Sequence, residues 1–167
     1  MKKLLVITLI SSFCLSAFAG DDGYKIKIKF KGLKDTTCYL GNYFGNKQYY
    51  KDTARVDANG ICVFQGKEAL PGGIYTIIMN NTQLFELVVN ESFIEMETDT
   101  INYVKNMVIK KSEENRLFFK HLIFVGDKQK TMMELQSKLT DEKTSESEKK
   151  QIQLDLEKIN EEIKKLR

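Results

Sequence analysis

Apolar and charged residues alternate without a break from residue 24 to residue 31. Tyr24, Ile26, Ile28 and Phe30 fall on one side of an extended chain, and four lysines fall on the other. A two-residue repeat is typical of a β-strand with one face in a protein core and one face in water. We therefore predict a half-buried strand here, with a lysine row that is either a solvated sheet face or a surface for an acidic partner.

Short apolar or alternating segments, separated by turn residues, continue to about residue 110. The predicted strands span 37–44, 48–56, 61–65, 74–79, 84–89, 93–98 and a short last segment at 107–110. Many short strands with frequent turns favour a sheet sandwich or barrel over an α/β fold. The fold class is therefore predicted to be mainly β with an α extension, an antiparallel β-sandwich or open barrel of seven to eight strands followed by a helical hairpin.

One predicted turn allows a register to be argued. Asp57-Ala58-Asn59-Gly60 has the composition of a hairpin loop between two of these strands. A three-residue loop with Gly60 in the left-handed region would pair Val56 with Cys62 and Ala54 with Phe64. We prefer this register because it gathers apolar residues on one face.

The period changes at Ser112, which predicts the start of a helix. Ser112 is suited to an N-cap, and Glu113 and Glu114 place negative charge in the first turn. Apolar residues then recur at helical spacing to Leu139, and Gly126-Asp127 is predicted to bend or interrupt the helix. Residues 140–147 have no periodicity and are predicted to form a loop.

A second helix follows with a coiled-coil pattern. Ser145 and Glu148 have the spacing of a capping box. The apolar residues after them recur at alternating steps of four and three, at Ile152, Leu156, Ile159, Ile163 and Leu166. This seam is too short to be stable alone, so it must pack against the preceding helix as a helical hairpin or against a second copy of the chain as a homodimer.

The N-terminus has the pattern of an export signal. Two lysines precede an apolar run from Leu4 to Phe18, and Ala17-Phe18-Ala19 provides small residues for cleavage after Ala19. We expect three parts: a signal peptide at 1–19, a β-domain at 20–111 and a helical extension at 112–167. The cleaved protein is expected in the periplasm or outside the cell, and not embedded in the membrane.

Charge argues against nucleic acid as a partner. The formal net charge is +3, and removal of Lys2 and Lys3 with the signal leaves +1. A nearly neutral protein has no long-range attraction for a polyanion.

Three cysteines and one histidine offer little catalytic chemistry. Cys14 lies in the signal, and no C-x-x-C motif is present. Cys38 and Cys62 are predicted to face the core, as free thiols in the favoured interpretation or as a structural disulfide; a catalytic pair is the least favoured alternative. His121 has no cysteine, histidine or carboxylate beside it in a ligand-like spacing, so neither a metal site nor a cofactor is expected.

Other side chains have a structural and a functional interpretation. Glu95 and Glu97 resemble an acid pair, but their alternation with apolar residues favours the wet face of a sheet. Five tyrosines are candidates for lining a ligand groove or are simply common strand residues: Tyr39, Tyr43, Tyr49, Tyr50 and Tyr75.

Several short segments together indicate a family. They are Gly32-Leu33-Lys34-Asp35-Thr36-Thr37, Tyr39-Leu40-Gly41, Asp52-Thr53-Ala54, Gly60-Ile61-Cys62-Val63-Phe64, Leu70-Pro71-Gly72-Gly73-Ile74-Tyr75 and Ser112-Glu113-Glu114-Asn115. With them the segment from Tyr24 to Glu114 resembles the domain of unknown function 4369 family, the β-domain that begins many exported thioredoxin-like proteins of one Gram-negative bacterial phylum.

The resemblance implies a role beside a redox partner. In that family the helical segment usually leads into a thioredoxin-like domain with a W-C-x-x-C motif, which has no counterpart before Arg167. We therefore expect a non-catalytic binding or positioning module of a thioredoxin-like thiol–disulfide oxidoreductase system, truncated or split from its partner. The alternatives are a self-standing interaction protein that dimerises through its C-terminal helix, and a ligand-binding module.

The same phylum modifies exported proteins on short aspartate–threonine motifs. Asp35-Thr36-Thr37, Asp52-Thr53-Ala54 and Asp99-Thr100-Ile101 resemble that acceptor pattern. The resemblance implies O-glycosylation of Thr36, Thr53 or Thr100; the alternative is that these pairs are turn and strand-end residues.

Overall fold

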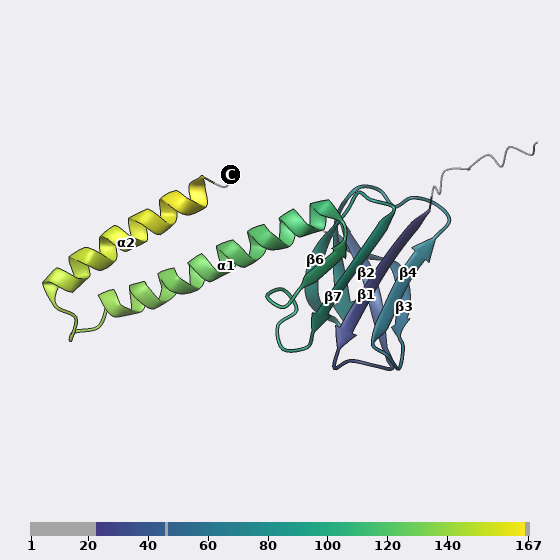
Figure 1. Ribbon diagram of the computed structural model, residues 1–167, viewed down its shortest axis with the longest axis horizontal. Helices are drawn as coiled ribbons and strands as arrows, with labels where there is room; N and C mark the ends of the chain where they lie inside the picture. Colours follow the sequence, from purple (N-terminus) through teal and green to yellow (C-terminus); the bar gives the residue numbers. More distant parts are fainter. Residues whose placement is uncertain (1–22, 46, 166–167) are drawn as a thin grey trace, which may run out of the picture.

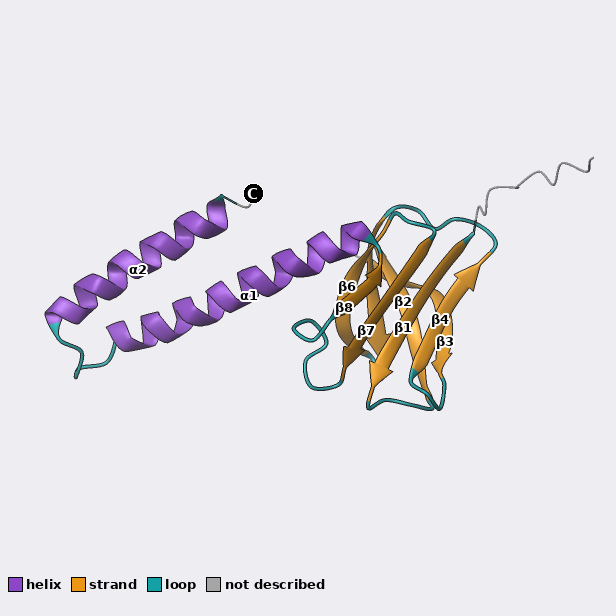
Figure 2. Cartoon of the chain, viewed as in Figure 1, coloured by secondary structure: helices purple, strands orange, loops and turns teal. Residues whose placement is uncertain are grey.

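The computed structural model describes residues 23–45 and 47–165 (Figure 1). The predicted signal peptide and Leu166, the last residue of the predicted seam, lie outside the described residues. Eight strands build a two-layer sandwich, and two helices form an arm that extends from one edge of it (Figure 2). The predicted fold class is confirmed as a sandwich with an open edge.

Each layer of the sandwich has four strands. The first sheet has the order β4-β1-β7-β8 and is made of β4 (Ile61–Gly66), β1 (Tyr24–Lys31), β7 (Phe93–Asp99) and β8 (Val108–Lys111). The second sheet has the order β3-β2-β5-β6 and is made of β3 (Lys47–Val56), β2 (Thr36–Phe44), β5 (Gly73–Met79) and β6 (Thr82–Val89). All neighbouring pairs are antiparallel except β1 and β7, which run parallel.

The turn at residues 57–60 forms as predicted, but the predicted pairing across it is wrong. Gly60 has a φ of 78°, and its N–H donates to the Asp57 carbonyl at 2.9 Å. The two strands then separate into different sheets: Ala54 pairs with Cys38 of β2, and Cys62 pairs with Ile28 of β1. The apolar side chains still face one core, because the turn is a corner between the layers.

Side chains from both sheets fill the space between the layers. Ile26, Ile28 and Phe30 of β1 are at most 1% exposed, as their two-residue repeat predicts. The second sheet contributes Leu40, Tyr75, Ile77, Leu87 and Val89, each at most 2% exposed. The open edge beside β6 and β8 is filled by the start of the first helix, whose Phe119 is 2% exposed.

The first helix, α1 (Glu113–Leu139), is continuous, so the predicted bend at Gly126-Asp127 is wrong. A glycine lowers helix stability by about 1 kcal/mol relative to alanine but does not break a helix that neighbouring turns hold on both sides. Beyond its first turns, α1 leaves the sandwich and extends away from it (Figure 1).

The second helix, α2 (Glu146–Lys164), folds back along α1. Its predicted capping box is present: Glu148 N donates to Ser145 Oγ, and Ser145 N donates to Glu148 Oε2 at 2.9 Å. Ile152 and Ile159 of the predicted seam are each 8% exposed. The seam therefore packs within the chain as the predicted helical hairpin, and a salt bridge from Lys128 to Glu162 joins the two helices.

None of the helices in the described part of the chain is both long enough and apolar enough to span a membrane.

Candidate functional site at the junction of sandwich and arm

The most specific polar cluster lies where α1 meets the free edge of β6. Asn115 is completely buried, and its side-chain amide acts like the backbone of a neighbouring strand. Its Nδ2 donates to the Val88 carbonyl at 2.7 Å, and its Oδ1 accepts from the Val88 N–H at 2.9 Å. One side chain thus satisfies both edge groups of a residue on β6 and fastens the helix to the sheet.

Ser112 and Glu91 complete the connection. Ser112 Oγ accepts from the Asn115 backbone N–H at 3.1 Å, as the predicted N-cap requires, and donates to Glu91 Oε1 at 2.9 Å. Glu91 also accepts from Glu114 N at 3.2 Å, which places its carboxylate at the positive end of the helix dipole. We call Val88, Asn90, Glu91, Ser112, Glu114 and Asn115 the junction network; Asn90 Nδ2 donates to Glu114 Oε1 at 2.9 Å.

The backbone at Ser112 is strained, and the junction network holds it in place. Ser112 has a φ of 130°, a value that residues with a Cβ rarely adopt. Such a conformation costs on the order of 1–3 kcal/mol and persists only where the surrounding bonds determine it. The sharp change from β8 into α1 therefore depends on the hydrogen bonds of this serine.

Aromatic side chains of the core pack next to the junction network. The centroid of the Phe119 ring lies 6.1 Å from the ring centroid of Phe85 in β6 and 5.7 Å from that of Phe118. Farther along the helix, Lys105 Nζ bonds to Asp127 Oδ1 at 3.0 Å and ties the loop after β7 to α1. The first four turns of α1 are thus attached to the sandwich at several points, which fixes the direction of the arm.

Sequence reasoning found only part of this site. It predicted the cap at Ser112 and noted Asn115 within a family segment, but it gave neither Asn115 nor Glu91 a role. The sequence did contain a signal for Asn115. It is an uncharged polar residue three positions after the N-cap, on the same helix face as the apolar Phe119. The partner strand is distant in sequence, so the pattern alone does not identify it.

The two cysteines lie in the core, as predicted. Cys38 and Cys62 are both 0% exposed and are free thiols in this structure. A hydrogen bond with Cys62, together with burial, holds the pKa of the Cys38 thiol well above its ordinary value. A buried thiol that keeps its proton is a poor nucleophile.

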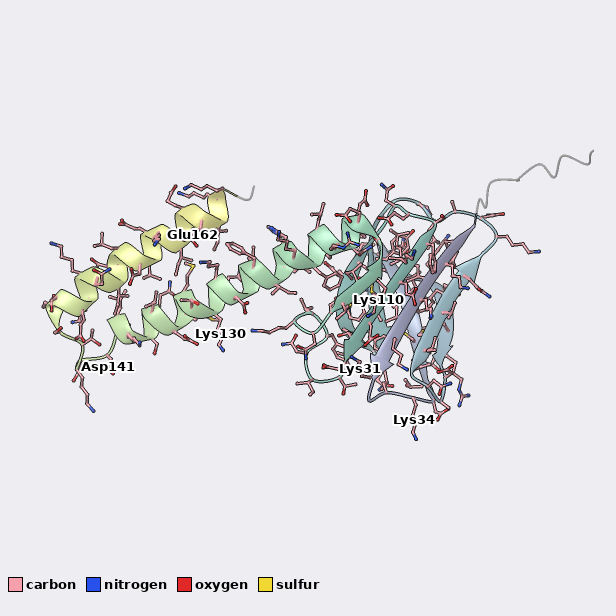
Figure 3. All side chains as sticks on the ribbon, viewed as in Figure 1. Lys31, Lys34, Lys110, Lys130, Asp141 and Glu162 are labelled. Carbon is pink, nitrogen blue, oxygen red and sulfur yellow. The ribbon has the colours of Figure 1, made fainter. Side chains whose placement is uncertain are left out.

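The lysine row on β1 lies beside carboxylates of its own sheet. Lys27 bonds to Glu95 at 2.9 Å and Lys31 to Glu97 at 2.6 Å, and Lys110 lies 3.9 Å from Glu97. Figure 3 labels Lys31 and Lys110, which lie on this sheet. The lysine contacts hold the pKa of Glu97 below its ordinary value. These residues form the solvent-facing side of the sheet, as the alternation of apolar and charged residues favoured.

The five candidate tyrosines do not line one groove. Tyr75 is buried in the core, where its hydroxyl donates to the Pro71 carbonyl at 2.9 Å. Tyr39 and Tyr50 lie against each other, with ring centroids 5.0 Å apart, and Tyr49 falls on the opposite side of β3 from Tyr50. Tyr43 Oη accepts from Gln83 at 2.6 Å.

The predicted modification sites are at turns and on a strand. Thr36 is half-buried at the start of β2, and Thr53 and Thr100 are exposed. The carboxylate of Asp99 accepts from Ile101 N at 2.9 Å and Asn102 N at 3.0 Å, which shapes the turn after β7. These bonds hold the pKa of Asp99 below its ordinary value. O-glycosylation of the three threonines stays a prediction.

His121 is exposed on α1. Within residues 23–45 and 47–165, no three histidine, cysteine or acidic side chains converge as a metal site would require.

Comparison with known proteins gives one family and no individual relative. No curated protein and no solved structure matches the chain. Residues 24–118 match the family described as "Domain of unknown function (DUF4369)". This match covers more than half of the chain and includes the whole sandwich, Ser112, Asn115 and Phe118. The protein therefore belongs to the DUF4369 family.

Proposed function

We propose that the protein is a non-catalytic positioning module of an exported thioredoxin-like system. The sandwich serves as the base, and the helical arm presents a partner or a partner domain at a fixed place. The junction network carries this proposal, because it is the most elaborate polar structure of the described chain and its effect is to fix a helix to a sheet edge.

The environment of the cysteines supports a non-catalytic role. Thiol–disulfide exchange needs an accessible thiolate with a lowered pKa. Cys38 has the opposite properties, since it is buried and its pKa is raised. Redox activity in such a system would then belong to the partner.

The arm provides a suitable surface for that partner. A helix rises about 1.5 Å per residue, so the part of α1 beyond Asp127 carries the hairpin roughly 20 Å from its last tie to the sandwich. Residues of α2 that face away from α1 are mostly charged, which suits a polar contact. The dimer alternative is less favoured, because Ile152 and Ile159 already pack against α1.

Two assays test the proposal. The cleaved chain should not reduce insulin in the presence of dithiothreitol, whereas thioredoxin-like proteins with a W-C-x-x-C motif from the same organism should do so. Titration calorimetry with those proteins should detect binding to the wild-type chain and weaker binding to a chain with Lys150→Glu and Lys158→Glu on the outer side of α2. Insulin reduction at the rate of a dithiol catalyst, or no binding to any of those proteins, would contradict the proposal.

A further inference from the structure

One edge of the second sheet is closed by the helix, and the opposite edge is open. At β6, the Asn115 amide bonds to the N–H and the carbonyl of Val88. At the opposite edge, β3 pairs with β2 alone among the described residues, and it lies on the side of the sandwich away from α1 (Figure 1). An edge strand has backbone N–H and carbonyl groups that can pair with a further strand. Thr53 N donates to the Asp52 carboxylate at 2.7 Å, so we expect a further strand to pair mainly with the other residues of β3.

Positive side chains without a carboxylate partner lie along β3. Lys47, Lys51 and Arg55 recur at every fourth residue, and all three are exposed. Within residues 23–45 and 47–165, Lys47 and Lys51 form no salt bridge. Arg55 has only a distant contact, at 3.9 Å from Asp35. Two lysines of β1, by contrast, bond to carboxylates of the neighbouring strand. The positive charge of β3 is therefore available to a partner.

Tyrosine rings and a hollow adjoin the same edge. Tyr50 is 60% exposed, and its ring centroid lies 5.0 Å from that of Tyr39. A hollow of about 350 Å³ opens beside β3, and its lining combines apolar surface with Lys51, Lys67 and Glu68. Tyrosine and arginine are enriched where proteins bind one another. The edge thus has apolar rings and a hollow for side chains next to its free backbone groups.

We propose that β3 is a docking site for an acidic, extended segment of another protein, which adds to the second sheet as a further strand. Backbone hydrogen bonds along the edge supply affinity, and alternate side chains of the segment contact the outer face of the sheet. The carboxylates of the segment lie beside Lys47, Lys51 and Arg55. This surface is on the sandwich and is separate from the outer side of α2, so it goes beyond the proposed function.

A second copy of the chain does not fit this edge. An antiparallel pairing of β3 with its own copy about Lys51 would place Lys51 opposite Lys51 and Lys47 opposite Arg55. Like charges directly opposite each other destabilise a strand pair, and lysines on an edge discourage self-association. A membrane surface would attract the lysines but has no backbone groups to pair with the edge. An acidic polypeptide satisfies both the charges and the backbone.

Calorimetry with a synthetic peptide tests the proposal on the cleaved chain. The probe is a peptide as long as β3 that alternates glutamate with threonine. We expect it to bind the wild-type chain and to bind about tenfold more weakly, or less, to the chain with Lys47→Glu and Lys51→Glu. Lys34→Glu with Lys120→Glu is the matched control, because it makes the same change in net charge at exposed positions elsewhere. No binding to the wild-type chain, or equal weakening by the two pairs, would overturn the proposal.

Two further probes distinguish strand addition from a general attraction for anions. The same peptide with methylated backbone nitrogens cannot donate to the edge, so it should bind the wild-type chain about tenfold more weakly or less. Vesicles that contain phosphatidylglycerol should not retain the chain in a sedimentation assay. Equal binding of the two peptides, or retention of the chain by the vesicles, would overturn the proposal.

Discussion

At the scale of residues, a few buried polar groups determine how the parts of this protein are joined. Asn115 matters because its amide has a donor and an acceptor on one rigid plane, and the edge of β6 offers the complementary pair at Val88. A buried polar group costs free energy unless it is bonded, so the same side chain would destabilise any arrangement in which α1 left the sheet.

Asn115→Asp is expected to lower the free energy of unfolding by about 3 kcal/mol. The new carboxylate has nearly the same shape but cannot donate to the Val88 carbonyl, and it places negative charge against that oxygen. Urea unfolding measures the change. Asn160→Asp, on the exposed surface of α2, is the matched control and should cost at most about 0.5 kcal/mol. Equal effects of the two changes would contradict the role given to Asn115.

The reduced chain should lose stability in mild alkali. Contact with Cys62 and burial raise the pKa of Cys38 in the folded state, whereas a thiol in the unfolded chain has a pKa of about 8.5. The unfolded state therefore gains stability as the pH rises, and the folded state does not. We expect a loss of about 1 kcal/mol between about pH 7.5 and about pH 9.5, measured by urea unfolding under reducing conditions.

Cys38→Ala is the control for this pH dependence, because it removes the titrating thiol and keeps the other ionisable groups. Its stability should fall less than that of the reduced wild-type chain over the same pH range. The account of Cys38 is wrong if both chains lose the same amount.

At the scale of elements, local sequence patterns were sufficient to predict where most strands and helices lie. The two-residue repeat and turn residues were sufficient for the strands, and the caps at Ser112 and Ser145 were sufficient for the helix starts. The strand pairing across residues 57–60 could not be predicted from the sequence. A hairpin register considers only the two strands beside the turn, whereas β4 pairs with β1, which is distant in sequence. The continuity of α1 through Gly126 was missed because helical neighbours outweigh one poor residue.

The helical hairpin offers a matched pair of substitutions. Ile159→Asp places a charge between α1 and α2, where the side chain is 8% exposed, and should lower the free energy of unfolding by about 2–4 kcal/mol with a loss of helical circular dichroism. Leu154→Asp makes the same change at a position of α2 that is 53% exposed and should have little effect.

Sedimentation of the same proteins distinguishes the hairpin from a dimer. The wild-type chain and both variants should sediment as monomers. A wild-type dimer that Ile159→Asp dissociates would show instead that this seam joins two copies.

At the scale of the whole molecule, the chain consists of a sandwich and an arm whose relative direction is fixed at one edge. The sequence predicted both parts, but the direction of the arm arises from Asn115, Ser112 and Glu91, which lie on segments far apart in the sequence. A module that positions a partner requires this fixed direction; a flexibly linked arm would only tether it.

The distance distribution between the sandwich and the arm tests this claim most directly. Spin labels at Gln65→Cys on β4 and Ser137→Cys on α1 occupy exposed positions, while Cys38 and Cys62 are buried from the label. A second pair at Ser137→Cys and Gln153→Cys, both within the arm, is the reference. Double electron–electron resonance should give one narrow distribution for each pair, and Asn115→Asp should broaden only the first. A broad sandwich-to-arm distribution in the wild-type chain, beside a narrow one within the arm, would contradict the account.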